Sequence, residues 1–190
     1  MKKIAITGNI ASGKSKLEHV LIEKGFIVFD TDIIVHDILI DKPDVATAFE
    51  NHDVFEFGRL SNKKLGDLVF SNPELRKKLE SIIHPLVLDE INQIFKTYRN
   101  EKYVFISIPL LFEVGWESLF DEIIFIQSNS DIRLNRLMAR NNLSKKEALS
   151  RINCQMEEDY KIDKANYIIN NNSTLSEYKE KIDKLITNFK

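Results

Sequence analysis

The sequence has little cysteine, no long hydrophobic run and no excess of one charge. Cys154 is the single cysteine among 190 residues, so the chain can form no intramolecular disulfide, and a reducing compartment is the simpler expectation. The longest nearly apolar stretch, 103–112, is much shorter than the ~20 residues of a membrane-spanning helix. The apolar run after Lys2 and Lys3 ends too soon for a signal-peptide core. We therefore expect a cytoplasmic protein.

Charge is nearly balanced, with 27 Lys and Arg against 29 Asp and Glu and a formal net charge of −2. Such a chain has no general attraction for nucleic acid or an anionic membrane, so we expect neither as a partner. Any anionic ligand must be captured by a local arrangement of groups. The 43% hydrophobic content and the length are typical of one globular domain with a sizeable core.

Short apolar segments alternate with helical patterns along the chain. Between the first two segments, Leu17, Val20 and Leu21 have helical spacing and Gly25 follows as a C-terminal cap. A strand, a helix and a strand within about thirty residues predict a βαβ unit with parallel pairing. The sequence therefore predicts an α/β domain, a parallel sheet covered by helices on both faces, with strands at 3–7, 26–29, 103–108, 123–126 and 167–169.

Two helical blocks interrupt this alternation. The first, about 33–99, contains no convincing core strand, and its helical candidates 75–83 and 86–98 are separated by His84-Pro85. It resembles a cap inserted over the carboxyl edge of the sheet, where ligands bind in open α/β folds. The second block, about 131–159, is strongly charged and lies between two late strands.

A phosphate-binding pattern follows the first strand. Gly8, Gly13, Lys14 and Ser15 fit Gly-x4-Gly-Lys-Ser between a strand and a helix, which is the context that the pattern requires. Glycine lets backbone N–H groups approach phosphate, and the helix adds its positive N-terminal end. Lys14 can reach the β- and γ-phosphate oxygens, and Ser15 can bind Mg²⁺. The pattern predicts a bound nucleoside triphosphate.

The surrounding residues favour a small-molecule kinase. The segment 126–129 lacks the Asn-Lys-x-Asp that specifies guanine, and the strand at 103–108 runs into Pro109 rather than the acidic residue of motor ATPases. Asp30 and Asp32 follow the second strand, which we expect beside the phosphate loop. A carboxylate there can accept a hydroxyl proton or help to hold Mg²⁺. Alternatively, Asp32 only caps a helix that begins at Ile33.

Arginines in the second helical block form a possible lid. Arg136 and Arg140 are four residues apart and share one helix face. Two guanidinium groups closing over a γ-phosphate would stabilise transition-state charge and exclude water. A solvated basic face that pairs with Glu147 is the alternative.

Taken together, these residues resemble the dephospho-CoA kinases, which complete coenzyme A biosynthesis. The resemblance extends nearly end to end, and its motifs keep the order and spacing of that family. They are the loop 7–15, Asp30-Thr31-Asp32, His84-Pro85-Leu86, Pro109-Leu110-Leu111-Phe112-Glu113, Arg136-x3-Arg140 and the segment 165–172.

The resemblance implies ATP-dependent phosphorylation of the ribose 3′-hydroxyl of dephospho-CoA, on a P-loop NTPase-type fold with a helical substrate-binding insertion and a helical lid. Asp32 would engage the acceptor hydroxyl, while Lys14 and Arg140 would neutralise the transferring phosphoryl group. Ser15 would bind Mg²⁺. The residues expected to bind ATP are Gly8, Asn9, Ile10, Ala11, Ser12, Gly13, Lys14, Ser15, Lys16, Arg136 and Asn171. Those expected on the acceptor side are Asp32, His84, Leu111, Phe112 and Glu113.

The same resemblance divides one kinase domain into parts. The core would comprise about 1–32, 100–130 and 160–190, the CoA-binding insertion about 33–99, and the lid about 131–159. Asn9 and Ala11 depart from the family loop, where both positions are usually glycine. Because Asn tolerates left-handed backbone, Ala11 is the more constrained, and we expect an effect on nucleotide affinity. Another small-molecule or nucleotide kinase, or a nucleotide-dependent switch, is the alternative function.

Overall fold

The computed structural model describes residues 1–41 and 43–189, and the chain divides into two compact units. Unit 1 comprises Met1–Asp30 and Asn100–Lys190, and unit 2 comprises Thr31–Arg99. Within the described residues, no helix is long and apolar enough to cross a membrane.

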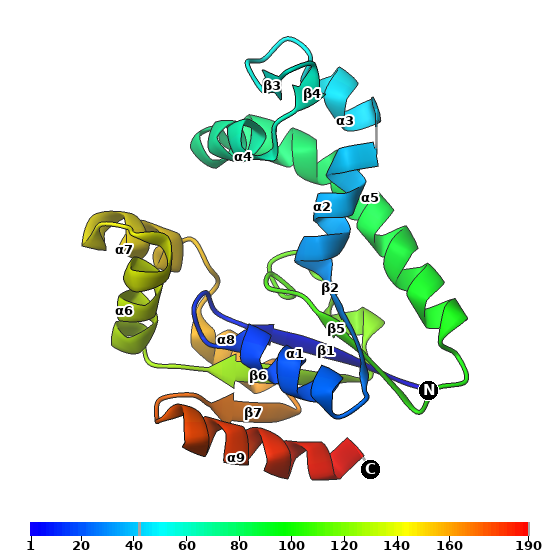
Figure 1. Ribbon diagram of the computed structural model, residues 1–190, viewed down its shortest axis with the longest axis vertical. Coiled ribbons are helices and arrows are strands. Elements are labelled where there is room, and N and C mark those ends of the chain that lie inside the picture. The colour runs from blue at the N-terminus through cyan, green and yellow to red at the C-terminus, as the bar shows by residue number, and fades with distance from the viewer. Residues whose placement is uncertain (42, 190) are drawn as a thin grey trace. The chain divides into compact units, whose positions relative to one another are not determined.

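Unit 1 is built around a parallel sheet, which confirms the predicted α/β fold. Its five described strands lie in the order β2-β5-β1-β6-β7 (Figure 1). The middle strand, β1, is almost continuously apolar because helices cover both faces; Ile4, Ala5 and Ile6 are fully buried. The bounds are β1 Lys2–Gly8, β2 Ile27–Asp30, β5 Tyr103–Ser107, β6 Glu122–Gln127 and β7 Tyr167–Asn170.

Strand β2 does not lie beside β1, so that expectation is wrong. Strand β5 lies between them, and Ser107 at its end is the register partner of both Ile6 in β1 and Asp30 in β2. A βαβ crossover fixes the hand of the connection but not which strand the chain rejoins. Asp30 consequently lies two strands from the phosphate loop, with Ser107 between.

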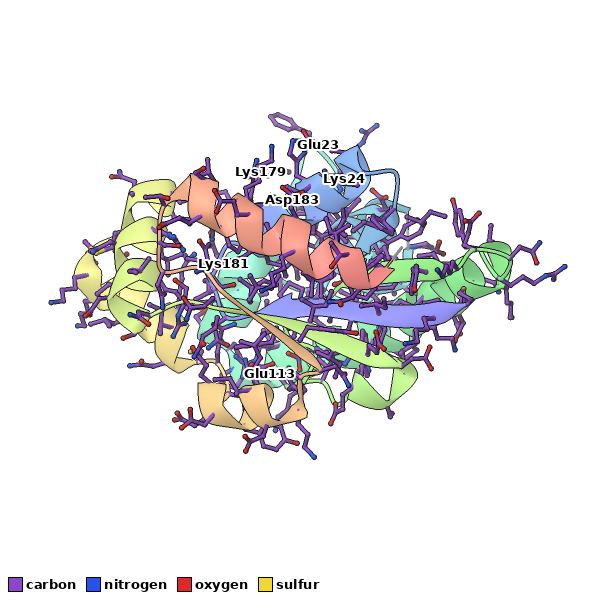
Figure 2. All side chains as sticks on the ribbon, turned by 90° about the horizontal axis from the view of Figure 1, so that it is seen from below. Glu23, Lys24, Glu113, Lys179, Lys181 and Asp183 are labelled. Atoms are coloured by element: carbon purple, nitrogen blue, oxygen red, sulfur yellow. The ribbon has the colours of Figure 1, made fainter. Side chains whose placement is uncertain are left out.

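Helices of unit 1 cover the two faces of the sheet. Helix α1 (Lys14–Glu23) and helix α9 (Leu175–Ile186) pack with the sheet around a common core that includes Leu17, Phe105 and Ile182. Figure 2 shows Lys24 and Asp183 at this contact, where their side chains form an ion pair of 3.2 Å. The C-terminal cap expected at Gly25 is confirmed, because its φ is 84° and its N–H donates to Ile22 O.

The remaining helices of unit 1 come from the late part of the chain. Helix α8 packs on β6, and helices α6 and α7 pack on each other. They are α6 Ser130–Asn141, α7 Lys145–Asn153 and α8 Glu158–Lys164, with short 3₁₀ turns at η1 Glu117–Leu119 and η2 Thr187–Phe189.

Unit 2 is mainly helical and has no core strand among its described residues; its two short strands pair with each other. Helix α5 packs against α2, α3 and α4. The bounds are α2 Thr31–Asp41, α3 Pro43–Ala48, β3 Phe55–Glu56, β4 Arg59–Leu60, α4 Asn62–Ser71 and α5 Pro73–Thr97.

Helix α5 runs unbroken through Pro85, so the predicted separation at His84-Pro85 is wrong. A proline removes one N–H donor and crowds one carbonyl of the preceding turn, a cost of ~3 kcal/mol in a helix interior. Packing along the whole helix offsets that local cost, because Ile83, Val87 and Ile91 form a buried stripe at four-residue intervals. The helix begins at a cap, where Asn72 Oδ1 accepts N–H bonds of 3.0 and 3.1 Å.

Candidate nucleotide site

The predicted phosphate loop joins β1 to α1 at the carboxyl edge of the sheet, and the two glycines of its Gly-x4-Gly pattern are sterically required. A Cβ on Gly8 would lie 2.6 Å from Ser12 Oγ and 2.8 Å from Ile126 O. Gly13 has φ 102°, and a Cβ there would lie 2.2 Å from Asn171 Nδ2. Gly13 also precedes α1 without any side-chain cap, so the first N–H groups of the helix can receive an anion.

Ala11 is the non-glycine residue of the loop that adopts left-handed backbone, with φ 61°. This confirms that position 11, rather than position 9, carries the conformational constraint. Ile10 and Ala11 also pack on an apolar cluster of α6 and α7 formed by Leu134, Leu137 and Ala148. Side chains of the loop thus attach it to the second helical block.

The Asn9 side chain ties the loop to α8. Its Nδ2 donates to Glu158 Oε2 at 3.1 Å, and its Oδ1 accepts from Lys161 Nζ at 2.8 Å. Lys161 is 1% exposed and donates a second bond, of 2.6 Å, to Glu113 Oε1. The neighbouring N–H of Ile10 donates to Gln155 Oε1 at 2.7 Å. Sequence reasoning missed Gln155, Glu158 and Lys161, because no local pattern links residues this far apart.

Asn171 and Tyr178 hold the other side of the loop. Asn171 Nδ2 donates to Ser12 O at 2.7 Å, and the Tyr178 hydroxyl donates to Gly13 O at 3.1 Å. Burial raises the pKa of the Tyr178 phenol, so it remains a donor at physiological pH. Asn171 was predicted near the nucleotide, whereas Tyr178 gave no signal beyond an apolar helical position.

The lysine of the predicted phosphate loop lies in a compact polar cluster. Lys14 Nζ donates to Glu18 Oε1 at 2.7 Å and to Ser107 Oγ. Ser107 Oγ in turn donates to the same Glu18 oxygen at 2.5 Å. Glu18 is 9% exposed and Ser107 is fully buried. Sequence reasoning missed Glu18 and Ser107; the one available signal was the four-residue spacing of Lys14 and Glu18 on α1.

The two arginines predicted to lie in a lid have different surroundings. Arg136 is half-buried, and its guanidinium donates to Ser128 Oγ at 3.3 Å and to Asn171 O at 3.2 Å. Arg140 is exposed near the end of α6, and its Nε donates to Asn141 Oδ1 at 2.9 Å. Arg136 is therefore linked to the Asn171 brace, whereas Arg140 presents its charge at the surface.

Arg133 lies on a buried face of α6. Its Nε donates to Ser128 O at 2.9 Å, and its Nη2 lies 3.4 Å from Glu158 Oε2. Burial lowers the pKa of the Arg133 guanidinium, and the Glu158 carboxylate acts in the opposite direction. Arg133 thus reinforces the attachment of α6 to α8.

The predicted acceptor-side residues are divided between the units. In unit 1, Leu111 and Phe112 are buried, and Glu113 lies beside α8 (Figure 2), where it pairs with Lys161 and accepts the Met156 N–H. In unit 2, His84 is half-buried in α5 and Asp32 is exposed in the first turn of α2. Asp32 lies inside that turn rather than before it, because the helix begins at Thr31 and not at Ile33.

A parallel sheet whose first strand leads through Gly-x4-Gly-Lys-Ser into a helix defines a P-loop nucleotide-binding protein. Its particular family follows from comparison with known proteins. The family model for dephospho-CoA kinase matches residues 2–177, and the chain belongs to this family. A dephospho-CoA kinase of Listeria innocua is 38% identical over 196 residues, which cover 99% of this chain and 97% of the relative.

Solved structures agree with that assignment. The crystal structure of a Thermus thermophilus protein has a TM-score of 0.87 and 33% identity, covering 100% of this chain and 98% of its own. The structure of a dephospho-CoA kinase from Campylobacter jejuni has a TM-score of 0.77 and 29% identity, covering 98% of this chain and 96% of its own.

Proposed function

We propose that this protein transfers the γ-phosphoryl group of ATP to the ribose 3′-hydroxyl of dephospho-CoA, giving coenzyme A and ADP. The observation that carries the proposal is the family match over residues 2–177, which includes the phosphate loop, Asp32 and the lid arginines. Phosphoryl transfer requires a cation beside the anionic phosphates of its donor, and Lys14 supplies one at the loop. A cytoplasmic location belongs to the same proposal and is supported by the single cysteine.

On the donor side, the loop N–H groups and the start of α1 would hold the phosphates of ATP. Lys14 and Arg140 would neutralise charge that develops on the transferring group. Arg136 and Asn171 would act from the braced side of the loop, where Arg136 already donates to Asn171 O. The block 131–159 would serve as the lid that carries both arginines.

On the acceptor side, Asp32 would accept or orient the proton of the ribose hydroxyl. The insertion 33–99 would bind the CoA portion, with His84 from this part and Leu111, Phe112 and Glu113 from unit 1. Glu113 is held in place by Lys161, so its carboxylate is fixed rather than free to rotate.

Mg²⁺ fits the donor set at the loop. Ser15 is an exposed hydroxyl in the first turn of α1, and Glu18 places a carboxylate one turn further along. Hard oxygen donors of this kind suit Mg²⁺, which takes its other ligands from phosphate and water. No group of three His, Cys, Asp or Glu able to hold a metal occurs in the described residues. When bound, Mg²⁺ would neutralise charge on the phosphate oxygens.

The test is acceptor-dependent release of ADP from ATP, with the product identified by mass spectrometry. We expect release to require dephospho-CoA, and the new phosphate to be on the ribose 3′-oxygen. A preference for nucleoside monophosphates across a panel of acceptors would instead assign a different small-molecule kinase. Tight ATP binding without acceptor-dependent turnover would assign a switch.

A further inference from the structure

Glu18 places a carboxylate inside the nucleotide site where no sequence motif predicts one. It follows Lys14 by one turn of α1, and helical spacing puts Ser15 on the same side of the helix. Its side chain is 11% exposed, and its Oε1 accepts bonds from both Lys14 and Ser107. The carboxylate is therefore held between the phosphate loop and the sheet.

Ser107 lies at the strand end where other P-loop proteins have an acidic residue. It is the last residue of β5, the strand that pairs with β1. P-loop NTPases hold Mg²⁺ with the loop Ser or Thr and with an acidic residue of the Walker B strand. In this chain the end of the neighbouring strand carries a hydroxyl, and its Oγ lies 2.5 Å from the Glu18 carboxylate.

Stability alone gives a poor reason for this arrangement. A nearly buried ion pair usually gains little over apolar residues of the same size, because both charges lose their hydration. Lys14 is required by the phosphate of the ligand, but its helical neighbour is not. The carboxylate at position 18 is therefore better explained by a role in nucleotide or metal binding than by stability.

We propose that Glu18 is a positioning residue for Mg²⁺: it supplies, from α1, the carboxylate that other P-loop proteins supply from a strand end. Ser107 fixes its orientation. The Glu18 carboxylate would accept hydrogen bonds from the water molecules of an ion that Ser15 binds. The inference rests on the proposed function only in requiring Mg·ATP as the donor, and it does not depend on the acceptor.

The first experiment measures the dissociation constant of ATP by calorimetry, once with Mg²⁺ and once with EDTA. Its readout is the quotient of Kd in EDTA over Kd with Mg²⁺, which is large when the ion strengthens binding. In Glu18→Ala and Glu18→Gln we expect this quotient to fall at least ~10-fold, which corresponds to ~1.4 kcal/mol. Affinity in EDTA should be equal or tighter in Glu18→Ala, because a negative charge near the triphosphate is removed. Glu23→Gln, on the exposed side of α1, is the matched control and should keep the wild-type quotient.

Several outcomes overturn the inference. If Glu18 only orients Lys14, its removal changes affinity equally with and without Mg²⁺, and the quotient stays constant. A wild-type quotient near one also contradicts the proposal. Asp30, the register partner of Ser107 in β2, is the competing source of a carboxylate. Loss of Mg²⁺ dependence in Asp30→Asn but not in Glu18→Gln would assign the role to Asp30.

The second experiment moves the carboxylate from position 18 to position 107. Because Ser107 Oγ contacts the Glu18 carboxylate, an aspartate at position 107 would put its own carboxylate near the same place. The double variant Glu18→Ala/Ser107→Asp should regain the quotient to within ~3-fold of wild type, whereas Glu18→Ala/Ser107→Ala should not. A purely structural role for Glu18 predicts no difference between the two doubles.

Thermal unfolding of every variant separates folding from binding. If Glu18→Ala does not fold, Glu18→Gln, which keeps the shape of the side chain, carries the test. Failure of the proposed function is distinguishable: a wild-type protein that binds Mg·ATP but does not phosphorylate dephospho-CoA leaves the Glu18 measurement intact. An unchanged quotient in an active kinase overturns only the role of Glu18.

Discussion

Replacing Ala11 by glycine should relieve strain in the phosphate loop. Left-handed backbone costs an L-residue ~1–2 kcal/mol relative to glycine, and Ala11 has φ 61°. Two losses oppose the gain. Glycine loses ~0.4–1 kcal/mol more conformational free energy on folding. The half-buried methyl group contributes roughly 0.4 kcal/mol, taken as half the value of a buried CH₂.

The balance is a stabilisation of about 0.4 kcal/mol, which for a domain of this size raises Tm by ~1–2 °C. Ala11→Val is the informative partner variant, because a β-branched residue at positive φ is a strong outlier. We expect Ala11→Val to lose at least ~1–2 kcal/mol relative to the wild type. Calorimetric or circular-dichroism melts of the three proteins give the comparison.

The nucleotide affinity of Ala11→Gly is the second readout. The strain is present in the loop before any ligand binds, and packing against α6 and α7 maintains it. Its relief should therefore change stability more than ATP affinity, and Kd should stay within ~3-fold of wild type. This prediction replaces the effect on nucleotide affinity that the sequence alone led us to expect at Ala11. The reasoning is refuted if Ala11→Gly destabilises the protein by more than ~1 kcal/mol, or if Ala11→Val melts with the wild type.

Four further substitutions test the site. Lys14→Ala should lower kcat at least ~100-fold, measured as acceptor-dependent release of ADP. It should also lower stability by ~1–3 kcal/mol because Glu18 loses its cation, and adding Glu18→Ala should recover part of that stability. Asp32→Ala should nearly abolish turnover while calorimetry shows ATP binding unchanged; near-normal kcat would exclude its role as base or positioning group. Arg140→Ala should depress kcat more than it raises the acceptor KM, and the reverse pattern would place Arg140 in ground-state binding. Lys161→Met removes the nearly buried cation that holds Asn9 and Glu113, so the melting temperature should fall, and an unchanged melt would show that the bridge contributes nothing.

The strands and the phosphate loop could be predicted from local sequence patterns. The phosphate loop depends on glycines at two positions, and the clashes that a Cβ would meet at Gly8 and Gly13 explain why the pattern is specific. Apolar runs located the strands because β1 and its neighbours are buried on both faces. Both signals are contained within a few consecutive residues.

The errors and omissions have a common physical origin in long-range packing. Strand β2 pairs with β5 rather than with β1, and the residues near Phe26 contain no signal for which strand it will join. Helix α5 passes Pro85 because packing along its length outweighs one missing hydrogen bond. Glu18 and Lys161 escaped notice because their partners are Ser107 and Asn9, far away in the chain. The roles of Asp32, His84 and Arg140 stay predictions.

The central place of β1 has a consequence for biosynthesis. The strand leaves the ribosome before its two neighbours, β5 and β6, which begin at Tyr103 and Glu122, and the contacts that brace its loop come from Asn171 and Tyr178. A nascent chain therefore carries the complete phosphate-binding motif long before it can hold that motif in shape. Non-local pairing of this kind slows folding and leaves early segments exposed to chaperones and proteases. Truncated products that end before Asn171 would contain the signature and lack the site.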